Sequence, residues 1–195
     1  GGIDAIRHGG NFWSGDGAIY ASWANNVNPN DITIGDDVEF TSDFANSVSE
    51  STYGNMDKYV EGGLRINEAP DGYRLENGCL INNKTDKIAN GLTVYSKSHQ
   101  KSFVYLGKSA FTSCNQLKLT IGHEYIHATH YFMASVNALK NVNKMYGAIP
   151  YTELAAYNWE ASMGVNNGYR NLPCSLGSFS WKIRPYFNWL LNASF

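Results

Sequence analysis

The feature that most constrains the fold of this chain is a long run of apolar residues at helical spacing. Apolar side chains recur three or four positions apart, which places them on one face of an α-helix. These residues are Leu117, Ile121, Tyr125, Ala128 and Phe132. The pattern predicts a helix from about residue 115 to 142, which Gly147 and Pro150 end. It is the longest regular element that the sequence predicts.

Shorter elements flank this helix. Segments 92–95 and 103–106 are rich in β-branched and aromatic residues, and the polar segment 96–102 between them suits a hairpin. After the long helix, residues 152–163 predict a second helix, with a threonine as its cap and a glycine as its stop. Strands that precede helices in this way predict an α+β domain.

The first third of the chain carries weaker signals. Residues 1–35 are rich in Gly and Asn and predict a connector with one short strand, Ile32–Ile34, so that the main domain spans 36–195. Turns are expected at Gly62–Gly63 and at Pro70–Gly72. The chain does not begin with Met and has no apolar signal-peptide segment, so we expect it to begin inside a longer polypeptide.

Composition excludes several classes of function. The net charge is −2 and the basic residues are scattered, so we expect no nucleic-acid partner. A hydrophobic content of 43% with 13 Tyr and 5 Trp indicates a globular chain, and no apolar run is long enough for a membrane span. Cys79, Cys114 and Cys174 lack metal-binding spacing. They predict buried thiols, with one disulfide and one free thiol as the alternative.

The chemistry is concentrated in the run His123-Glu124-Tyr125-Ile126-His127. Residues four apart lie one helical turn above each other, so both imidazoles project from one face toward one cation. Zinc takes nitrogen ligands at about 2.0–2.1 Å. Glu124 then lies beside the open position, where it accepts a proton from the attacking water and passes it to the leaving amine. We predict His123 and His127 as zinc ligands and Glu124 as the general base.

A catalytic zinc needs a third protein ligand. His130 shares the stripe of His123 and His127, but seven residues of straight helix separate the first and last Cα atoms by about 10 Å. That distance is too long for one small ion. His130 is therefore expected to be a neighbour of the site or a core residue.

Two glutamates of the second predicted helix are the other candidates. Glu153 and Glu160 are seven residues apart and lie on one face. Glu153 is in the first turn, and a helix that returns antiparallel after Pro150 would bring it toward the motif. Glu160 is expected to be solvated or paired. Glu153 is thus the favoured third ligand.

These residues resemble a known family. His-Glu-x-x-His followed by a second-helix glutamate is the ligand set of gluzincin-type metallopeptidases, and the run 153–159, Glu-Leu-Ala-Ala-Tyr-Asn-Trp, is similar to their Glu-x-x-Ala-x-x-Phe pattern. The resemblance implies a zincin-like α+β fold: a small sheet, an active-site helix with His-Glu-x-x-His, and a second helix with the third ligand. Zn²⁺ would be bound by His123, His127 and Glu153. It also implies that Phe103–Leu106 is the edge strand along which a peptide substrate lies.

A second resemblance concerns biology. Residues 9–15, Gly-Gly-Asn-Phe-Trp-Ser-Gly, are similar to the joint where an Rhs-type scaffold meets its variable C-terminal toxin. The runs 105–111 and 121–127 are similar to metallopeptidase tips of such polymorphic toxins. The resemblance implies a secreted or delivered effector, carried by an upstream scaffold that ends at the 1–35 connector. It also implies a cognate immunity protein. We expect the domain itself to be a monomer.

Two rival interpretations remain at this point. One is an aromatic-rich binding module that recognises glycan or protein, and the other is a degenerate peptidase that keeps zinc without turnover. Glu124 argues against both, because a structural zinc has no use for a base between its ligands. The group that stabilises the oxyanion stays open among Tyr157, Tyr169 and His130.

Overall fold

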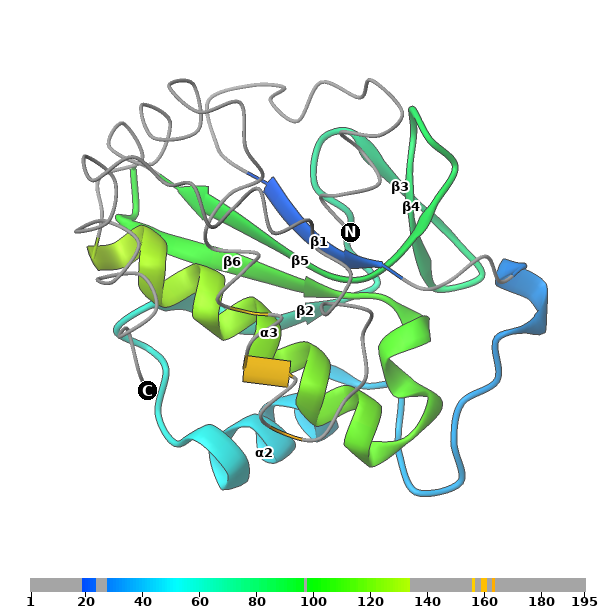
Figure 1. Ribbon diagram of the computed structural model, residues 1–195, viewed down its shortest axis with the longest axis horizontal. Helices are drawn as coiled ribbons and strands as arrows, with labels where there is room; N and C mark the ends of the chain where they lie inside the picture. The colour runs from blue at the N-terminus through cyan, green and yellow to red at the C-terminus, as the bar shows by residue number, and fades with distance from the viewer. Residues whose placement is uncertain are drawn as a thin grey trace, which may run out of the picture.

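A sheet with two helices against it forms the fold (Figure 1). The computed structural model describes residues 19–23, 28–96, 98–133, 156, 159, 160 and 163. The strands are β1 (Ile19–Trp23), β2 (Val60–Ile66), β3 (Tyr73–Glu76), β4 (Cys79–Asn82), β5 (Ile88–Ser96) and β6 (Lys101–Leu106). The helices are α2 (Ser42–Tyr53) and α3 (Cys114–Met133), with the 3-10 helices η1 (Pro29–Asp31) and η2 (Lys108–Thr112). The predicted α+β class is confirmed.

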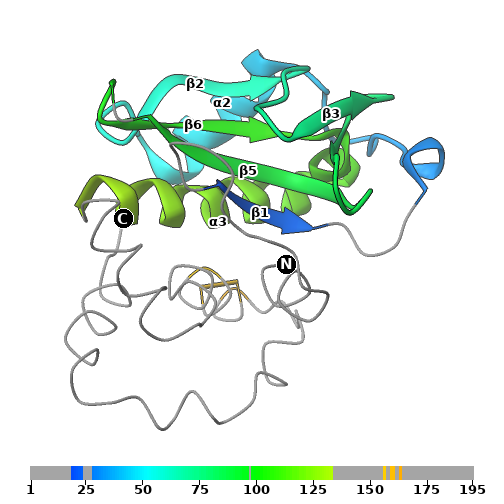
Figure 2. The same cartoon turned by 90° about the horizontal axis from the view of Figure 1, so that it is seen from above.

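The sheet is mixed, with the order β2-β6-β5-β4-β3, and β1 pairs with β5. Strand β2 is parallel to β6, and the other pairs are antiparallel. The predicted hairpin is confirmed, because Leu92 pairs with Tyr105 and Val94 with Phe103. The edge position expected for Phe103–Leu106 is wrong, because β6 lies between β2 and β5. Figure 2 shows β1, β5, β6 and β2 side by side, with β1 outermost.

Part of the segment predicted as a connector belongs to this fold. Strand β1 pairs with β5, with Tyr20 opposite Thr93. Ile32 is buried in a cluster with residues of β4 and β5, and the backbone N–H of Gly35 donates to the carbonyl of Phe111 at 2.9 Å. The strand expected over Ile32–Ile34 is not formed; Ile32 instead ends η1. Within the described ranges, the chain therefore shows no structural break at residue 35.

Two glycines lie inside β2, where the sequence predicts a turn. Gly62 and Gly63 have φ of 72° and 74°, and the pairing of β2 with β6 shifts between Val60 and Leu64. They form a bulge. The side-chain oxygen of Asn46 in α2 accepts the N–H of Leu64 at 2.9 Å, so the irregular backbone keeps its hydrogen bond. The other predicted turn is confirmed, because the N–H of Tyr73 donates to the carbonyl of Pro70 at 3.1 Å.

Local sequence explains where the helices begin and end. The hydroxyl of Thr41 accepts the N–H of Phe44 at the start of α2, and Gly54, with φ of 74°, ends it. At the start of α3 the hydroxyl of Ser113 accepts the N–H of Gln116. The carboxylate of Asp37 accepts the N–H of Cys114 at 3.1 Å, which also favours the positive end of the helix dipole. In the part of the chain that is described, neither helix is long and apolar enough to cross a membrane.

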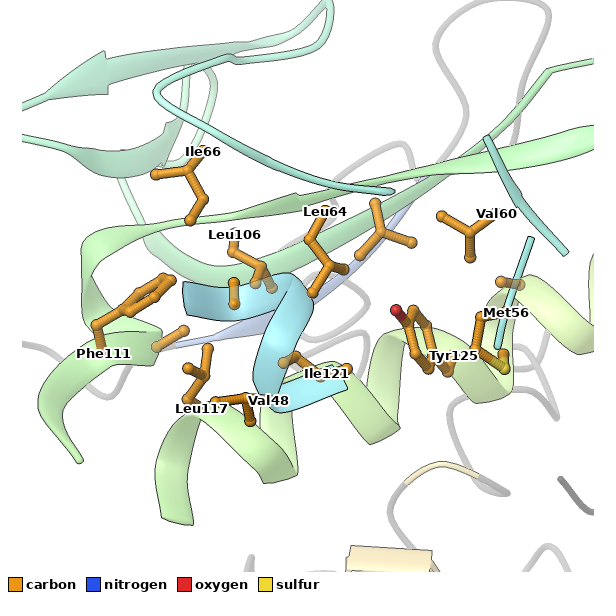
Figure 3. Packing of buried hydrophobic residues seen from close by; sticks show 14 of the residues in the cluster. Val48, Met56, Val60, Leu64, Ile66, Leu106, Phe111, Leu117, Ile121 and Tyr125 are labelled. Carbon is orange, nitrogen blue, oxygen red and sulfur yellow. The ribbon is translucent and has the colours of Figure 1, made fainter. Parts of the chain in front are cut away.

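The largest core cluster lies between the helices and the sheet (Figure 3). Leu117, Ile121 and Tyr125 point into it from α3, as the helical pattern predicts. Phe132 departs from the prediction, because it is 40% exposed and packs on the ring of Tyr59. From position 120 to 131 every residue of α3 is buried. The polar face of the helix is thus covered as well as its apolar face.

Candidate metal and catalytic site

The three motif residues predicted to carry the chemistry lie together in the middle of α3. His123, Glu124 and His127 are each 0% exposed. The helix runs without interruption from Cys114 to Met133, so the two histidines are one turn apart. Their ring centroids are 4.8 Å apart. This spacing brings two imidazole edges to the same place on the helix.

The tyrosine inside the motif fixes the helix from its opposite side. The hydroxyls of Tyr125 and Ser49 are 2.6 Å apart and both are buried. This hydrogen bond joins α3 to α2. The apolar face of α3 and this one hydrogen bond therefore determine together how the helix is rotated about its own axis.

The second helix reaches the site through Glu160. Of the predicted helix 152–163 the structure describes four residues: Ala156, Trp159 and Glu160 are helical, and Met163 is in a turn. Oε1 of Glu160 lies 2.6 Å from Nδ1 of His123, and the Glu160 side chain is 12% exposed. Of the two states expected for Glu160, solvated or paired, the structure shows the paired one. A carboxylate on one ring nitrogen fixes the orientation of a histidine, so Nε2 is the nitrogen that would face a metal.

Gly122 lets the second helix approach α3 this closely. A side chain at this position would collide with the indole ring of Trp159 and would lie 2.7 Å from the hydroxyl oxygen of Tyr53. Trp159 and Ala156 pack on Ile126. Ala156 meets Ile126, whereas Glu160, one turn later, meets His123, almost one turn earlier. The second helix therefore runs antiparallel to α3 here.

Glu124 points toward the sheet. Its Oε2 accepts a hydrogen bond of 2.8 Å from the hydroxyl of Thr93, which also lies 3.0 Å from the backbone oxygen of Glu124. Gly91, two residues earlier on β5, leaves room for the carboxylate, because a Cβ there would lie 2.8 Å from Oε1 of Glu124. Sequence reasoning missed Thr93 and Gly91. Thr93 lies in the segment predicted as a strand, 92–95, but Gly91 lies just before that segment. Only their spacing of two residues, which puts them on one face of a strand, could have indicated them.

His127 is electrostatically suited to bind a cation as the neutral imidazole. Burial lowers its pKa well below the usual value, and the nearby His123 and His130 lower the pKa further. Metal binding requires a deprotonated ring nitrogen. The surroundings of His127 therefore keep it in the form that a metal ligand needs.

The pair fits the zinc expectation, although the described residues do not complete a ligand set. Two converging imidazoles, one of them oriented by a carboxylate, are typical zinc donors. Among residues 19–23, 28–96, 98–133 and the four described positions beyond them, no three His, Cys, Asp or Glu side chains converge on one point. The predicted third ligand, Glu153, lies outside these ranges, as do Tyr157 and Tyr169. His130 is fully buried on α3.

Comparisons with family models, curated proteins and solved structures find no match to this chain. What the site can do therefore follows from its own residues.

Cys79 and Cys114 are free thiols, and Cys174 is outside the described residues.

Proposed function

We propose that this chain is a zinc-dependent endopeptidase with a zincin-like fold. The observation that carries the proposal is the placement of His123, Glu124 and His127 on one buried stretch of α3. The two imidazoles are one turn apart, and the carboxylate of Glu124, which lies between them in the sequence, is hydrogen-bonded to Thr93 of β5. Neither rival interpretation accounts for a carboxylate fixed at this position.

Each residue has a distinct role in this proposal. His123 and His127 bind zinc, which when bound supplies Lewis-acid activation of a water molecule and of the scissile carbonyl. Glu124 accepts a proton from the attacking water and later gives it to the leaving amine. Glu160 holds the ring of His123 through Nδ1. Because His123, Glu124 and His127 are buried, electrostatic interactions of their side chains are stronger than they would be in water.

The third ligand in the proposal is Glu153. In the helix that the sequence predicts for 152–163, Glu153 precedes Ala156 by three residues and Glu160 by seven, so all three share a face. That face contacts α3 at Ile126 and His123.

Glu153 and Glu160 are predicted to differ in their effect on zinc affinity. Glu153→Ala removes a direct ligand and is expected to weaken zinc binding far more than Glu160→Ala. Glu160→Ala removes an outer carboxylate, and such losses typically cost about 10–100-fold in metal affinity. Titration of zinc against a competing chelator measures both, with His130→Ala as a control of small effect. The reverse order would assign the ligand role to Glu160.

An extended substrate is proposed to lie beside β1. Strand β6, first expected to fill this role, is enclosed by β2 and β5. Strand β1 pairs with β5 and contacts α3. In the ranges that the structure describes, no strand pairs with the other edge of β1. An open edge offers backbone donors and acceptors to an added strand, and a cognate immunity protein would compete for this edge.

The biological context proposed is a toxin domain, delivered into a target cell as part of a larger polypeptide. This part of the proposal is supported by the sequence resemblance of residues 9–15 and of the two runs near the motif.

The proposed peptidase activity has a direct test. The zinc-loaded chain should cleave members of a panel of unfolded proteins, and a zinc chelator should stop the cleavage. Stoichiometric zinc without cleavage of any panel member would favour the binding module.

A further inference from the structure

The carboxylate of Glu124 is held by the sheet as well as by the helix that carries it. The hydroxyl of Thr93 lies 2.8 Å from Oε2, and both side chains are 0% exposed. Thr93 lies within the part of β5 that is paired on both sides, opposite Val104 of β6 and Tyr20 of β1. A hydroxyl on a strand paired on both sides is a rigid donor.

Gly91 limits the same carboxylate from a second direction. Thr93 and Gly91 are two residues apart on β5, so they share the face that packs on α3. A Cβ at Gly91 would lie 2.8 Å from Oε1 and 2.9 Å from Cγ of Glu124. The carboxylate thus rests over a residue without a side chain, while its other oxygen is bound by Thr93.

We propose that Thr93 is a positioning residue for Glu124, and that Gly91 provides the space in which Thr93 holds it. The inference rests on the proposed peptidase function. A glutamate has three side-chain torsions, and a general base must be held close to its productive geometry. The hydroxyl of Thr93, within hydrogen-bond distance of Oε2 and of the backbone oxygen of Glu124, restricts these torsions from the side of the sheet.

Thr93→Val tests this role because it keeps the shape of the side chain and removes the hydroxyl. We expect kcat to fall by about 10–10²-fold, as for a small misplacement of a catalytic group, with zinc affinity unchanged. Thr93→Ser keeps the hydroxyl and should restore most of kcat. The matched control is Thr129→Val, which removes a buried hydroxyl that donates to the backbone of Ile126 within α3. This control should leave kcat near the wild-type value.

A double-mutant cycle separates positioning from a general loss of structure. In a Glu124→Gln background, Thr93→Val should cause no further loss, because the group that Thr93 positions is already gone. A structural role would lower the residual rate again, and that result would overturn the inference. Gly91→Ala displaces the same carboxylate and should behave like Thr93→Val in this cycle.

A spectroscopic measurement tests the contact without turnover. In metal-free protein labelled with ¹³C at glutamate carboxylates, the Glu124 signal is identified by its loss in Glu124→Gln. The chemical shift of this signal should change in Thr93→Val and stay close to the wild-type value in Thr93→Ser. If the chain cleaves no protein, the peptidase proposal fails while this signal still reports the contact. If it cleaves protein and Thr93→Val has wild-type kcat, the inference about Thr93 is wrong.

Discussion

Replacement of Glu124 by Gln is expected to leave zinc bound while turnover falls by about 10²–10⁴-fold, the usual loss for a general base. The amide keeps the size of the side chain and can still accept a hydrogen bond from Thr93. It cannot take a proton from water. The test of this role is to compare the cleavage rates of wild type and variant at saturating substrate. Zinc content is measured in parallel. Equal rates would end the mechanism proposed for this site.

The same pair of proteins tests the toxin proposal. Cells that express the wild-type domain should stop growing, and cells that express Glu124→Gln should grow normally. If wild type is harmless in every compartment to which it is directed, and no dedicated partner is recovered from the native source, the toxin proposal fails. The peptidase proposal would survive, since it depends on α3 and its ligands.

The double substitution of His123 and His127 by Ala is expected to abolish zinc binding. Wild type should bind one zinc per chain, and the variant, which lacks both nitrogen donors, should bind none. Elemental analysis of purified protein measures the occupancy. His130→Ala is the matched control, because it removes a buried histidine of the same helix that the helix geometry excludes as a ligand. Full occupancy in the double variant would refute the site.

The elements that could be predicted from sequence are those whose partners are close in the chain. The apolar spacing of α3 predicted Leu117, Ile121 and Tyr125 in the core. The β5–β6 hairpin followed from two β-prone runs joined by a polar segment. In each case neighbouring residues determine the structure, so a local pattern is sufficient.

What could not be predicted depends on distant partners. Strand β6 is interior because β2, which precedes it by 35 residues or more, adds to it in parallel. Strand β2 contains Gly62 and Gly63, a pair that predicts a turn from the sequence alone. The residue that binds this bulge is Asn46 of α2, whose side-chain oxygen accepts the N–H of Leu64. The contact of Glu160 with His123 spans 37 residues. No local signal marks such pairs.

The burial of the motif was also beyond the reach of periodicity. Helical spacing shows which face of α3 is apolar, but it does not show what covers the other face. The second helix packs there through Trp159, and β5 receives Glu124. Polar residues that would suit a solvated surface therefore lie inside the protein.

The absence of a side chain at Gly122 has a consequence for recognising distant relatives of this chain. We expect a protein that keeps an indole against this turn of the helix to keep glycine immediately before the first histidine, because a methyl group there would overlap the ring unless the ring shifts. The signature expected of such relatives is therefore wider than His-Glu-x-x-His. It is Gly-His-Glu-x-x-His coupled to a downstream Trp-Glu pair, in which the tryptophan fills the space over the glycine and the glutamate reaches the histidine. A chain with the short motif but a larger residue before it would have to close its site by a different packing.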